Sequence, residues 1–401
     1  LCSKCQMYES FSLFPKTLQP TSMIISMKQF IIINSLNFNI LISGSEIETD
    51  NGYDLGVLVM KKTLLIVSIL ASLLFIGCTE KTSNNKEDLT KIGVTIYKYD
   101  DNFMSYVRRY IESSANAKAT LFINDSQNNQ AKQLEQVDTM IAKGVKALVI
   151  NLVDPKSAIT VIAKAKKANL PVIFFNKEPE SEVLNSYEKS WYVGTESQES
   201  GIMQGTIITD LWNKNKEQWD LNQDGKIQYV LLKGEPGHPD GEARTKYVID
   251  EVKKAGIEVE QLAIDTAMWD ATKAANKMDV WISKYGNKIE FVIANNDAMA
   301  LGALSSLEKA GYFKDNKIVP IVGVDAIPEV LIKIREGKIV GTVLNDAKDQ
   351  GQATFDLAFN AALGKDILEG TQWKLDVNKA VRVPYISITK DNLDVAEEAY
   401  N

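Results

Sequence analysis

From residue 91 onward, short runs rich in β-branched and aromatic residues alternate with longer segments of helical character. The runs that predict strands are 91–99, 119–125, 147–152, 171–177, 229–235, 258–265, 291–296, 320–325 and 341–346. Helical segments fill the gaps, such as the one that stops at Gly144 and the one that opens with Pro155. Near-continuous apolar strands that alternate with helices indicate parallel sheets covered on both faces. Because one open sheet usually holds about half as many strands, we predict two α/β domains.

Polar side chains follow most of the predicted strands, at the edge where open parallel α/β sheets bind ligands. These candidates are Asp101, Asn176, His238, Asp240, Arg244, Asn296, Asp325 and Asn345. Carboxylates, amides and a guanidinium offer paired donors and acceptors, which suits a neutral ligand covered in hydroxyl groups. A nucleotide is not favoured, because the sequence has no GxGxxG or GxxxxGK[ST] phosphate loop.

Each polar candidate has a plain structural alternative, because Asp and Asn often follow a strand only to cap the next helix. Asp297 and Asp346 are interpreted as such caps or turn residues. The convergence of several polar strand ends favours a binding site over a set of unrelated caps.

Two aromatic residues in predicted loops, Phe103 and Trp269, extend the candidate site. A sugar ring has an apolar C–H face that packs against a flat aromatic side chain. Trp212, Trp219 and Trp281 lie in helical segments and are interpreted as packing residues.

Composition argues against several function classes. Lys and Arg number 45 and Asp and Glu 52, so the net charge is −7. This balance argues against nucleic acid or an anionic membrane surface as the main partner. His238 is the only histidine, which excludes a His-rich metal site and leaves little room for a Ser-His-Asp triad.

Residues 60–77 have the pattern of a secretory signal peptide. Lys61 and Lys62 precede an apolar run, 64–76, that is too short to span a bilayer. Cys78 follows directly and resembles the lipidated cysteine of a bacterial lipoprotein, so we expect a lipid anchor; an ordinary signal peptide cut nearby is the alternative.

The segments on either side of this signal are interpreted as unfolded or extraneous. Residues 1–59 carry no targeting pattern and precede the signal, so we interpret them as the product of a misplaced translation start rather than as a domain. Residues 78–90 are polar and poor in aromatics, which is typical of a tether. Cys2, Cys5 and Cys78 are the only cysteines, so no disulfide is expected in the predicted domains.

A series of motifs, in this order, closely resembles the family of periplasmic galactose/glucose-binding proteins. They are "IGVTIYKYDDNFMS", "INLVDP", "VIFFNKEP", "LLKGEPGHPD", "IDTAMWD", "IANNDAMA", "GVDAIPE" and "GTVLNDA", and the resemblance runs from about Lys91 to Leu393. It implies the type I periplasmic binding protein fold, in which two parallel-sheet α/β lobes are joined by a three-segment hinge. The implied lobes are 91–194 plus 348–383 and 196–346 plus 385–401, with hinge crossings near Thr195, Ala347 and Pro384.

The resemblance also implies a function and roles for the candidate residues. The chain is expected to bind D-galactose and D-glucose in the periplasm and to perform no chemistry. The eight polar candidates would hydrogen-bond the sugar, and Phe103 and Trp269 would sandwich the pyranose ring. Asp101 would accept from the C4 hydroxyl of either epimer. The expected partners of this monomer are the membrane components of an ABC transporter, with a chemoreceptor as a second reader of the closed shape.

The stretch "DLNQDGKIQ" begins like the calcium loop of an EF-hand, with Asp220, Asn222 and Asp224 at positions one, three and five. Position twelve, normally a bidentate Glu, is Leu231, so the residues alone favour a solvated turn. The resemblance instead implies a structural calcium ion. The remaining ligands would be Gln228, the backbone carbonyl of Lys226 and both carboxylate oxygens of the distant Glu290.

Three other functions compete with this interpretation. A glycosidase could use paired carboxylates such as Asp101 and Asp325, although the other candidates are amides and donors. A sugar-responsive repressor shares the two-lobe fold but needs an N-terminal helix-turn-helix, where this chain has a signal peptide. A binding protein for another monosaccharide, such as a pentose or a signalling sugar, is the strongest alternative.

Overall fold

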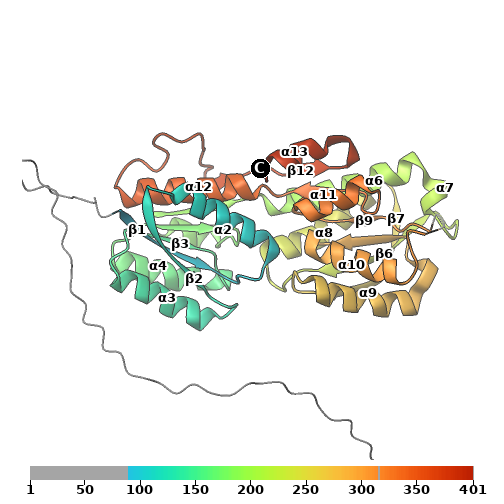
Figure 1. The fold of residues 1–401 in the computed structure, drawn as a ribbon, viewed down its shortest axis with the longest axis horizontal. Helices are drawn as coiled ribbons and strands as arrows, with labels where there is room; N and C mark the ends of the chain where they lie inside the picture. The colour runs from blue at the N-terminus through green and yellow to red at the C-terminus, as the bar shows by residue number, and fades with distance from the viewer. Residues whose placement is uncertain (1–88, 315–316, 401) are drawn as a thin grey trace, which may run out of the picture. The chain divides into compact units, whose positions relative to one another are not determined.

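The computed structural model describes residues 89–314 and 317–400, which lie within the compact unit Asn84–Asn401 (Figure 1). The predicted segments 1–59 and 60–77, the lipidation site Cys78 and the tether up to residue 88 lie outside the described residues. The first strand begins at Thr90, so the predicted tether ends earlier than residue 90. Within 89–314 and 317–400, no helix combines the length and apolar character needed to cross a membrane.

A six-stranded, all-parallel sheet forms the first half of the fold, which we call lobe 1. Its strand order is β11-β5-β4-β3-β1-β2. The strands are β1 (Thr90–Ile96), β2 (Ala119–Asp125), β3 (Ala147–Ile150), β4 (Val172–Phe175), β5 (Ser190–Gly194) and β11 (Ala380–Arg382). The helices are α2 (Asn102–Ala115), α3 (Gln130–Ala142), η1 (Pro155–Ser157), α4 (Ala158–Lys167), α5 (Ser181–Asn185) and α12 (Ala347–Ala362).

The apolar strands of lobe 1 are buried because helices cover both faces. Side chains alternate across a strand, and in β3 Ala147 and Val149 join the core under α2 and α12. Their neighbours Leu148 and Ile150 join a second core under α3 and α4. This two-sided burial explains why the sequence of such strands is apolar throughout rather than alternating.

The second half of the fold, lobe 2, has a four-stranded parallel sheet of order β7-β6-β8-β9 and an antiparallel pair, β10-β12. The strands are β6 (Lys226–Lys233), β7 (Glu258–Thr266), β8 (Phe291–Ala294), β9 (Ile321–Val322), β10 (Thr342–Leu344) and β12 (Ile386–Ile388). The helices are α6 (Ser197–Lys214), α7 (Lys216–Trp219), α8 (Pro239–Lys254), α9 (Ala271–Tyr285), η2 (Gly286–Lys288), α10 (Asp297–Lys309), α11 (Pro328–Arg335), η3 (Lys390–Asn392) and α13 (Leu393–Glu398). Its strands also feed two cores, with Val292 on one face and Ile293 on the other.

The chain passes between the two lobes three times. The crossings lie after β5, after β10 and between β11 and β12, because β11 pairs with β5 in lobe 1 whereas β12 pairs with β10 in lobe 2. Thus the predicted fold class, two parallel-sheet α/β lobes with three connecting segments, is confirmed. The lobe limits and the hinge residues stay predictions.

Several local predictions need correction. Phe103 lies in the first turn of α2 and not in a loop, because Asp101 caps that helix. Asp297 is not a cap: Asn296 caps α10, and the Asp297 carboxylate is buried. Asp346 is the cap of α12, as predicted. Strands β5, β11 and β12 were not predicted; the latter two have only three residues each.

Candidate functional site

One cavity between the two lobes contains all ten predicted binding residues. Its volume is about 30 Å³. Lobe 1 contributes Asp101, Phe103 and Asn176, and lobe 2 contributes His238, Asp240, Arg244, Trp269, Asn296, Asp325 and Asn345. Residues far apart in the sequence thus meet at the carboxyl ends of the strands, as expected for parallel sheets. The geometry brings these side chains together; their contact with a sugar stays a prediction.

Three of these residues cap helices and line the cavity at the same time. Asp101 Oδ1 accepts from the backbone N–H of Met104 at 2.8 Å, and Asn296 Oδ1 accepts from that of Met299 at 3.0 Å. His238 Nδ1 accepts from the backbone N–H of Asp240 at 3.2 Å. The cap and ligand interpretations are therefore compatible, because each side chain keeps hydrogen-bonding capacity beyond the bond that caps its helix.

His238 is a neutral donor in this setting. Burial lowers its pKa well below the usual value, and the nearby charges of Lys177 and Arg244 lower it further. Because Nδ1 accepts the bond from Asp240, the ring proton is on Nε2. His238 can thus donate from Nε2 to a hydroxyl oxygen.

Arg244 organises the charged groups on lobe 2. Its guanidinium donates to Asp240 Oδ2 at 3.3 Å, to the Asn295 carbonyl at 2.9 Å, to Ser200 Oγ at 3.2 Å and to the Tyr385 hydroxyl oxygen at 3.1 Å. Burial alone would lower the pKa of Arg244, but Tyr385, Asp240 and Asp325 raise it above its usual value. The buried cation is thus compensated by surrounding oxygens.

Asp325 and Asn345 form a second polar pair. Asn345 Nδ2 donates to Asp325 Oδ1 at 3.1 Å, and Gln350 Nε2 donates to Asn345 Oδ1 at 2.5 Å. Burial raises the pKa of Asp325 well above its usual value, and Asp297 adds to this, although Arg244 opposes it. A ligand that donates hydroxyl hydrogens to this carboxylate would stabilise its charged form.

Three residues of the cavity have a strained backbone. Asn176, Trp269 and Asp325 all have positive φ, at 63°, 62° and 125°. Non-glycine residues adopt such angles only where the surroundings enforce them, and such sites are often functional. The strain supports a selected geometry for these three side chains.

The aromatic walls are more enclosed than their predicted loop positions implied. Phe103 is 5% and Trp269 8% exposed, because the lobes cover both. The Trp269 ring meets the His238 ring edge-on, with centroids 5.0 Å apart. A Cβ at Gly234 would lie 2.1 Å from this indole, so Gly234 is required for the ring to lie there. Trp212, Trp219 and Trp281 are buried in helices, which confirms their packing role.

Sequence reasoning missed two residues that line the cavity, Tyr97 and Met104. The Tyr97 hydroxyl donates to Asp101 Oδ2 at 2.5 Å, so it orients a predicted ligand carboxylate. Tyr97 was placed inside the predicted strand 91–99, but β1 ends at Ile96. The signal that could have identified Tyr97 is its position directly after β1, at the strand end where such sheets bind ligands.

An ion pair joins the lobes at the edge of the cavity. Lys177 Nζ lies 2.8 Å from Glu235 Oε2, and the lysine side chain is 1% exposed. Asn128 Nδ2 donates to the other oxygen of the same carboxylate at 2.8 Å. Lobe 1 therefore holds Glu235 of lobe 2 from two positions.

The predicted calcium ligands gather in the loop between α7 and β6. Asp220 accepts from the backbone N–H groups of Asp224 and Gly225, at 3.0 and 2.9 Å. Glu290 reaches the loop from β8's start, and its oxygens accept from the N–H groups of Leu221 and Gln228, at 2.7 and 2.9 Å. The distant Glu290 thus closes the loop, whereas Leu231 lies in the β6 core.

The loop's donor set can be tested for its fit to a cation. Burial raises the pKa of Glu290, and Asp220 and Asp224 raise it further, so like charges converge there. Gln228 Nε2 donates to Asp224 Oδ2 at 2.7 Å, while Gln228 Oε1 is buried without a partner. Rotation of this amide would turn its oxygen toward Asp224, which fits a cation between them. Among residues 89–314 and 317–400, however, no three His, Cys, Asp or Glu side chains are yet close enough to form a metal cluster.

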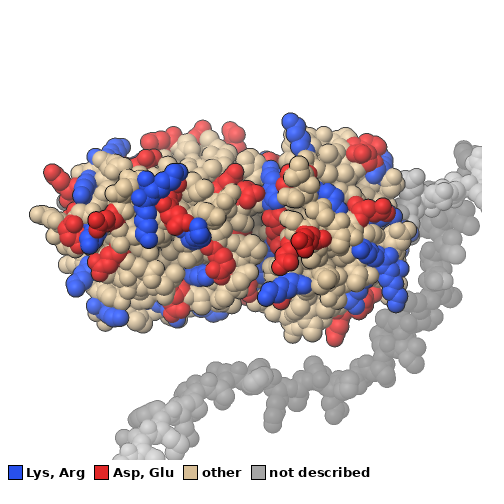
Figure 2. All heavy atoms as spheres, turned by 180° about the vertical axis from the view of Figure 1, so that it is seen from behind, with Lys and Arg blue, Asp and Glu red and all other residues tan. Residues whose placement is uncertain are grey.

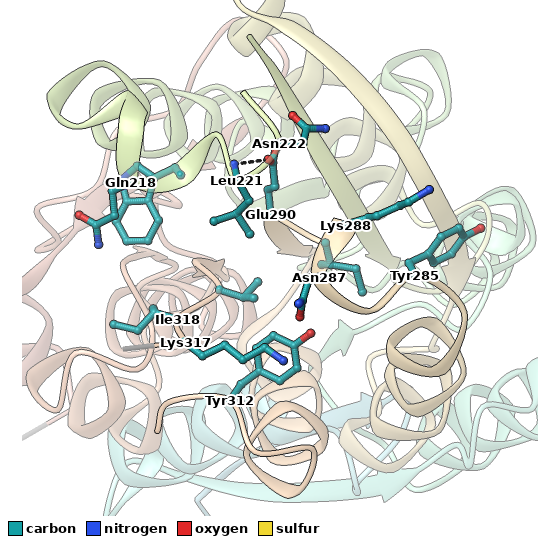
Figure 3. A pocket seen from close by; sticks show the side chains of 13 residues that line it. Gln218, Leu221, Asn222, Tyr285, Asn287, Lys288, Glu290, Tyr312, Lys317 and Ile318 are labelled. Atoms are coloured by element: carbon teal, nitrogen blue, oxygen red, sulfur yellow. Dashed lines mark hydrogen bonds between the residues drawn. The ribbon is translucent and has the colours of Figure 1, made fainter. Parts of the chain in front are cut away.

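A wider groove of about 680 Å³ lies beside this loop (Figure 3). Its lining includes Leu221, Tyr285, Glu290 and Tyr312, and Figure 3 shows the bond from Leu221 to Glu290 at its rim. None of the ten predicted binding residues lines it. The polar cavity between the lobes is therefore the candidate site.

Comparison with known proteins places the chain among binding proteins of known type. The model of the "Periplasmic binding protein domain" family matches residues 92–366. The D-galactose/methyl-galactoside binding periplasmic protein MglB of Haemophilus influenzae is 51% identical over 337 residues, which cover 83% of this chain and 98% of that protein. A putative rhizopine-binding protein of Rhizobium meliloti is 32% identical, covering 75% of this chain and 91% of its own.

Solved structures agree with the fold. An ABC transporter solute binding protein from Bacillus halodurans, solved with bound myo-inositol, superposes with a TM-score of 0.66 at 28% identity. The match covers 79% of this chain and all of that one. On the family model, the relatives and the two-lobe architecture together, the chain belongs to the periplasmic binding protein domain family.

Proposed function

We propose that this protein binds D-galactose and D-glucose in the periplasm and delivers them to the membrane components of an ABC transporter. The observation that carries this proposal is the cavity between the lobes, where carboxylates, amides, an arginine and a neutral histidine lie with two aromatic side chains. Its polar groups suit a ligand in which every hydroxyl both donates and accepts. The relative that shares 51% of its residues is named for galactose binding.

The cavity explains how a neutral sugar is held. Asp240 and Arg244 are already fixed by their own bonds, so little side-chain entropy is lost when a hydroxyl arrives. Asp101 is fixed by Tyr97 and by the Met104 amide in the same way. Charge-assisted bonds in a closed, dry cavity are strong ones. The aromatic rings of Phe103 and Trp269 offer flat surfaces to the apolar face of a pyranose.

Isothermal titration calorimetry tests the proposal directly. D-galactose and D-glucose should each bind with a Kd of about 1 µM or tighter, which corresponds to about −8 kcal/mol. D-ribose and myo-inositol serve as matched comparison ligands, because relatives and neighbours of this chain are named for ribose and were solved with myo-inositol. No heat with either hexose, and heat with one of the comparison ligands, would assign the cavity to another polyol.

The protein is a binding protein and not an enzyme, as its family is. The carboxylates Asp101 and Asp325 nevertheless face one cavity, so a glycosidase test is worthwhile. Nitrophenyl galactosides and glucosides should bind or be ignored without release of nitrophenol; steady release would overturn the binding function.

We further propose that the Asp220 loop holds a structural calcium ion, with Asp220, Asn222, Asp224, Gln228, the Lys226 carbonyl and Glu290 as ligands. The converging carboxylates and the unpartnered Gln228 oxygen support this. An all-oxygen set of this size suits calcium rather than magnesium. The ion would tie the loop to Glu290 and stabilise lobe 2.

Thermal unfolding with added calcium or chelator tests the calcium site. Calcium should raise the Tm of the wild type, because an ion that binds only the folded state stabilises it by mass action. Glu290→Gln should remove most of this rise, whereas Glu258→Gln, at an exposed ion pair with Lys226, should keep it. An equal calcium response in Glu290→Gln and wild type would return the loop to a polar turn.

A lipid anchor at Cys78, a monomeric state and recognition by a chemoreceptor complete the proposal. Charges of both signs are interspersed over the face in Figure 2, which offers no basic footprint for nucleic acid there.

Cys78→Ser should move the protein from the membrane fraction to the soluble fraction of the periplasm. A wild-type protein that is already soluble would exclude the anchor.

A further inference from the structure

The last turn of the chain contacts both lobes. Helix α13 belongs to lobe 2, where it packs on α11 and where Glu397 pairs with Arg335 (Figure 1). From lobe 1, the Tyr110 hydroxyl donates to the Ala399 carbonyl at 3.1 Å, and Lys348 Nζ donates to the Glu398 carbonyl at 3.4 Å. The C-terminal turn is therefore fixed on lobe 2 and also held by α2 and α12 of lobe 1.

Tyr400 uses this position to reach the binding cavity. Its ring packs edge-on against Tyr106 of α2, with centroids 4.9 Å apart. Its hydroxyl donates to the backbone carbonyl of Asp325 at 3.0 Å. Burial, then Asp325, raise the pKa of Tyr400 well above its usual value, so the hydroxyl keeps the proton it donates. The side chain packs against the apolar cores of both lobes.

The peptide that Tyr400 contacts is strained. Asp325 has a φ of 125° and Ala326 a φ of 56°, two positive values in succession in residues with a side chain. Such angles persist only when the surroundings hold them. Asp297 holds the far side of this turn by accepting from the Ile327 N–H at 3.0 Å. On the near side, the Asp325 carbonyl accepts from the Asn345 N–H at 3.3 Å and, at shorter range, from Tyr400.

The partner ring, Tyr106, lies on the helix that brings Phe103 to the other wall of the cavity. Tyr106 lies one helical turn after Phe103, which lines the cavity from lobe 1. Separation of the lobes would pull Tyr106 away from Tyr400, because they belong to different lobes. The ring contact exists only while the lobes are close, and the hydroxyl contact lies within lobe 2.

We propose that Tyr400 is a positioning residue of the ligand cavity: its hydroxyl holds the strained Asp325 turn, and its ring, through Tyr106, favours the closed arrangement of the lobes. This role rests on the proposed function, because the ligand is the proposed sugar. The contacts of Tyr400 themselves do not depend on that function. Within the part of the chain that the structure describes, the hydroxyl bond and the ring contact of Tyr400 reach the cavity lining only at Asp325. It acts on affinity through the shape of that turn and through closure.

Two substitutions separate the two contacts. Tyr400→Phe keeps the ring and removes the hydroxyl, and Tyr400→Ala removes both. Tyr187→Phe is the matched control, because it removes a tyrosine hydroxyl that donates to a backbone carbonyl, that of Leu170, entirely within lobe 1. Galactose binding and release are measured by stopped-flow tryptophan fluorescence, with Trp269 in the cavity as the reporter, and amide hydrogen exchange of 324–328 is measured without sugar.

The expected results are graded. Tyr400→Phe should speed galactose release by about 3- to 10-fold, the usual range for one neutral hydrogen bond, and should increase exchange in 324–328. Tyr400→Ala should release galactose faster still, and Tyr187→Phe should change release by less than about 2-fold. Unchanged release and unchanged exchange in Tyr400→Phe would overturn the role.

The exchange measurement also distinguishes this inference from the proposed function. If the wild type binds no hexose, the sugar assignment is wrong, and the exchange of 324–328 in Tyr400→Phe still decides whether Tyr400 holds the turn. If the wild type binds galactose and exchange rises without any effect on release, Tyr400 is a structural contact only and the positioning role is wrong.

Discussion

Lobe 1 brings three of the predicted ligand residues to the cavity and lobe 2 brings seven, and the two sets are supported differently. On lobe 2, Arg244 binds Asp240 directly and reaches Ser200, Asn295 and Tyr385 from three other segments. On lobe 1, Asp101 is held by its own first turn and by Tyr97, four residues earlier. Lobe 2 is thus a platform fixed by long-range contacts, whereas Asp101 on lobe 1 is fixed locally and Asn176 by one bond from Asn151 of the same lobe, at 3.2 Å.

This difference predicts a division of labour during binding. A platform whose polar groups are already oriented loses little entropy when a ligand arrives. A wall whose supporting contacts lie within lobe 1 can move as a unit without disturbing the platform. We therefore expect a sugar to meet lobe 2 first and lobe 1 to close over it, as in hinge closure around a ligand.

The largest effect is expected from breaking the platform at Arg244. Arg244→Met leaves the buried Asp240 carboxylate without its cation, and removal of one partner from a buried pair usually costs about 3–5 kcal/mol. Galactose binding should be lost, and the free energy of unfolding in urea should fall by that order. Both are measured on the purified protein by calorimetry and by denaturant titration.

Arg382→Met in lobe 1 is the control for Arg244→Met. Arg382 pairs with Glu178 and Asp376, but its side chain is 22% exposed, so solvent can compensate for its loss. It should keep galactose binding and lose less stability. A smaller stability loss at Arg244 than at Arg382 would contradict the view that lobe 2 is the charged platform.

The second effect separates binding from stability on lobe 1. Asp101→Ala should lower galactose affinity by about 100-fold, because a buried carboxylate acceptor is removed from the cavity. Its unfolding free energy should fall by only about 1 kcal/mol, the typical value of a helix cap.

Trp269→Ala on lobe 2 should also nearly abolish binding while the protein stays folded. Galactose affinity retained by either variant would show that the cavity is not the sugar site.

The contrast between the lobes also explains which parts of the site the sequence reveals. Asp101, Asn296 and Asn345 come at strand ends, and the parallel-sheet rule places such ends together. Tyr97 escaped detection because it extends an apolar run that reads as strand, although the strand stops at Ile96. Local pattern therefore predicts ten of the twelve residues that line the cavity and misses Tyr97 and Met104.

The residues that support the site from distant parts of the chain could not be predicted from the sequence. Tyr385 and Ser200 contact Arg244 from segments far away in the sequence, and nothing in their own surroundings marks them. Long-range packing, which no local pattern encodes, decides these positions.

The third effect concerns the protonation of the buried Asp297 side chain on lobe 2, which makes the stability of the protein depend on pH. Burial raises the pKa of Asp297 to about 7, although Thr342 and the Ile327 N–H, which both donate to it, oppose this. The folded state therefore holds a proton that the unfolded state releases near pH 4. This contribution to stability is complete below about pH 4 and is lost as the pH rises to about 7.

Asp297→Asn tests this contribution, because the amide does not titrate. The unfolding free energy of the wild type minus that of the variant should fall by on the order of 4 kcal/mol between pH 4 and pH 8, from about three pKa units. Urea titrations at four pH values measure the difference. A difference that stays constant, or rises with pH, would show that Asp297 is ionised in the folded protein and that the platform tolerates its charge.

The smallest effect is expected where the two walls meet. Lys177 Nζ contacts Glu235 and the Val153 carbonyl, and it lies 4.0 Å from the centre of the Tyr97 ring. Lys177→Met should accelerate galactose release about tenfold, or ~1.4 kcal/mol, because the ion pair between the lobes is lost while Glu235 keeps Asn128 and partial solvent exposure. Stopped-flow measurement of galactose release tests this prediction.

In a double-mutant cycle, Glu235→Gln should add little to the effect of Lys177→Met, because each substitution removes the same ion pair. If the two effects instead add fully, the lobes are held by separate contacts, and closure depends on the ligand rather than on this ion pair.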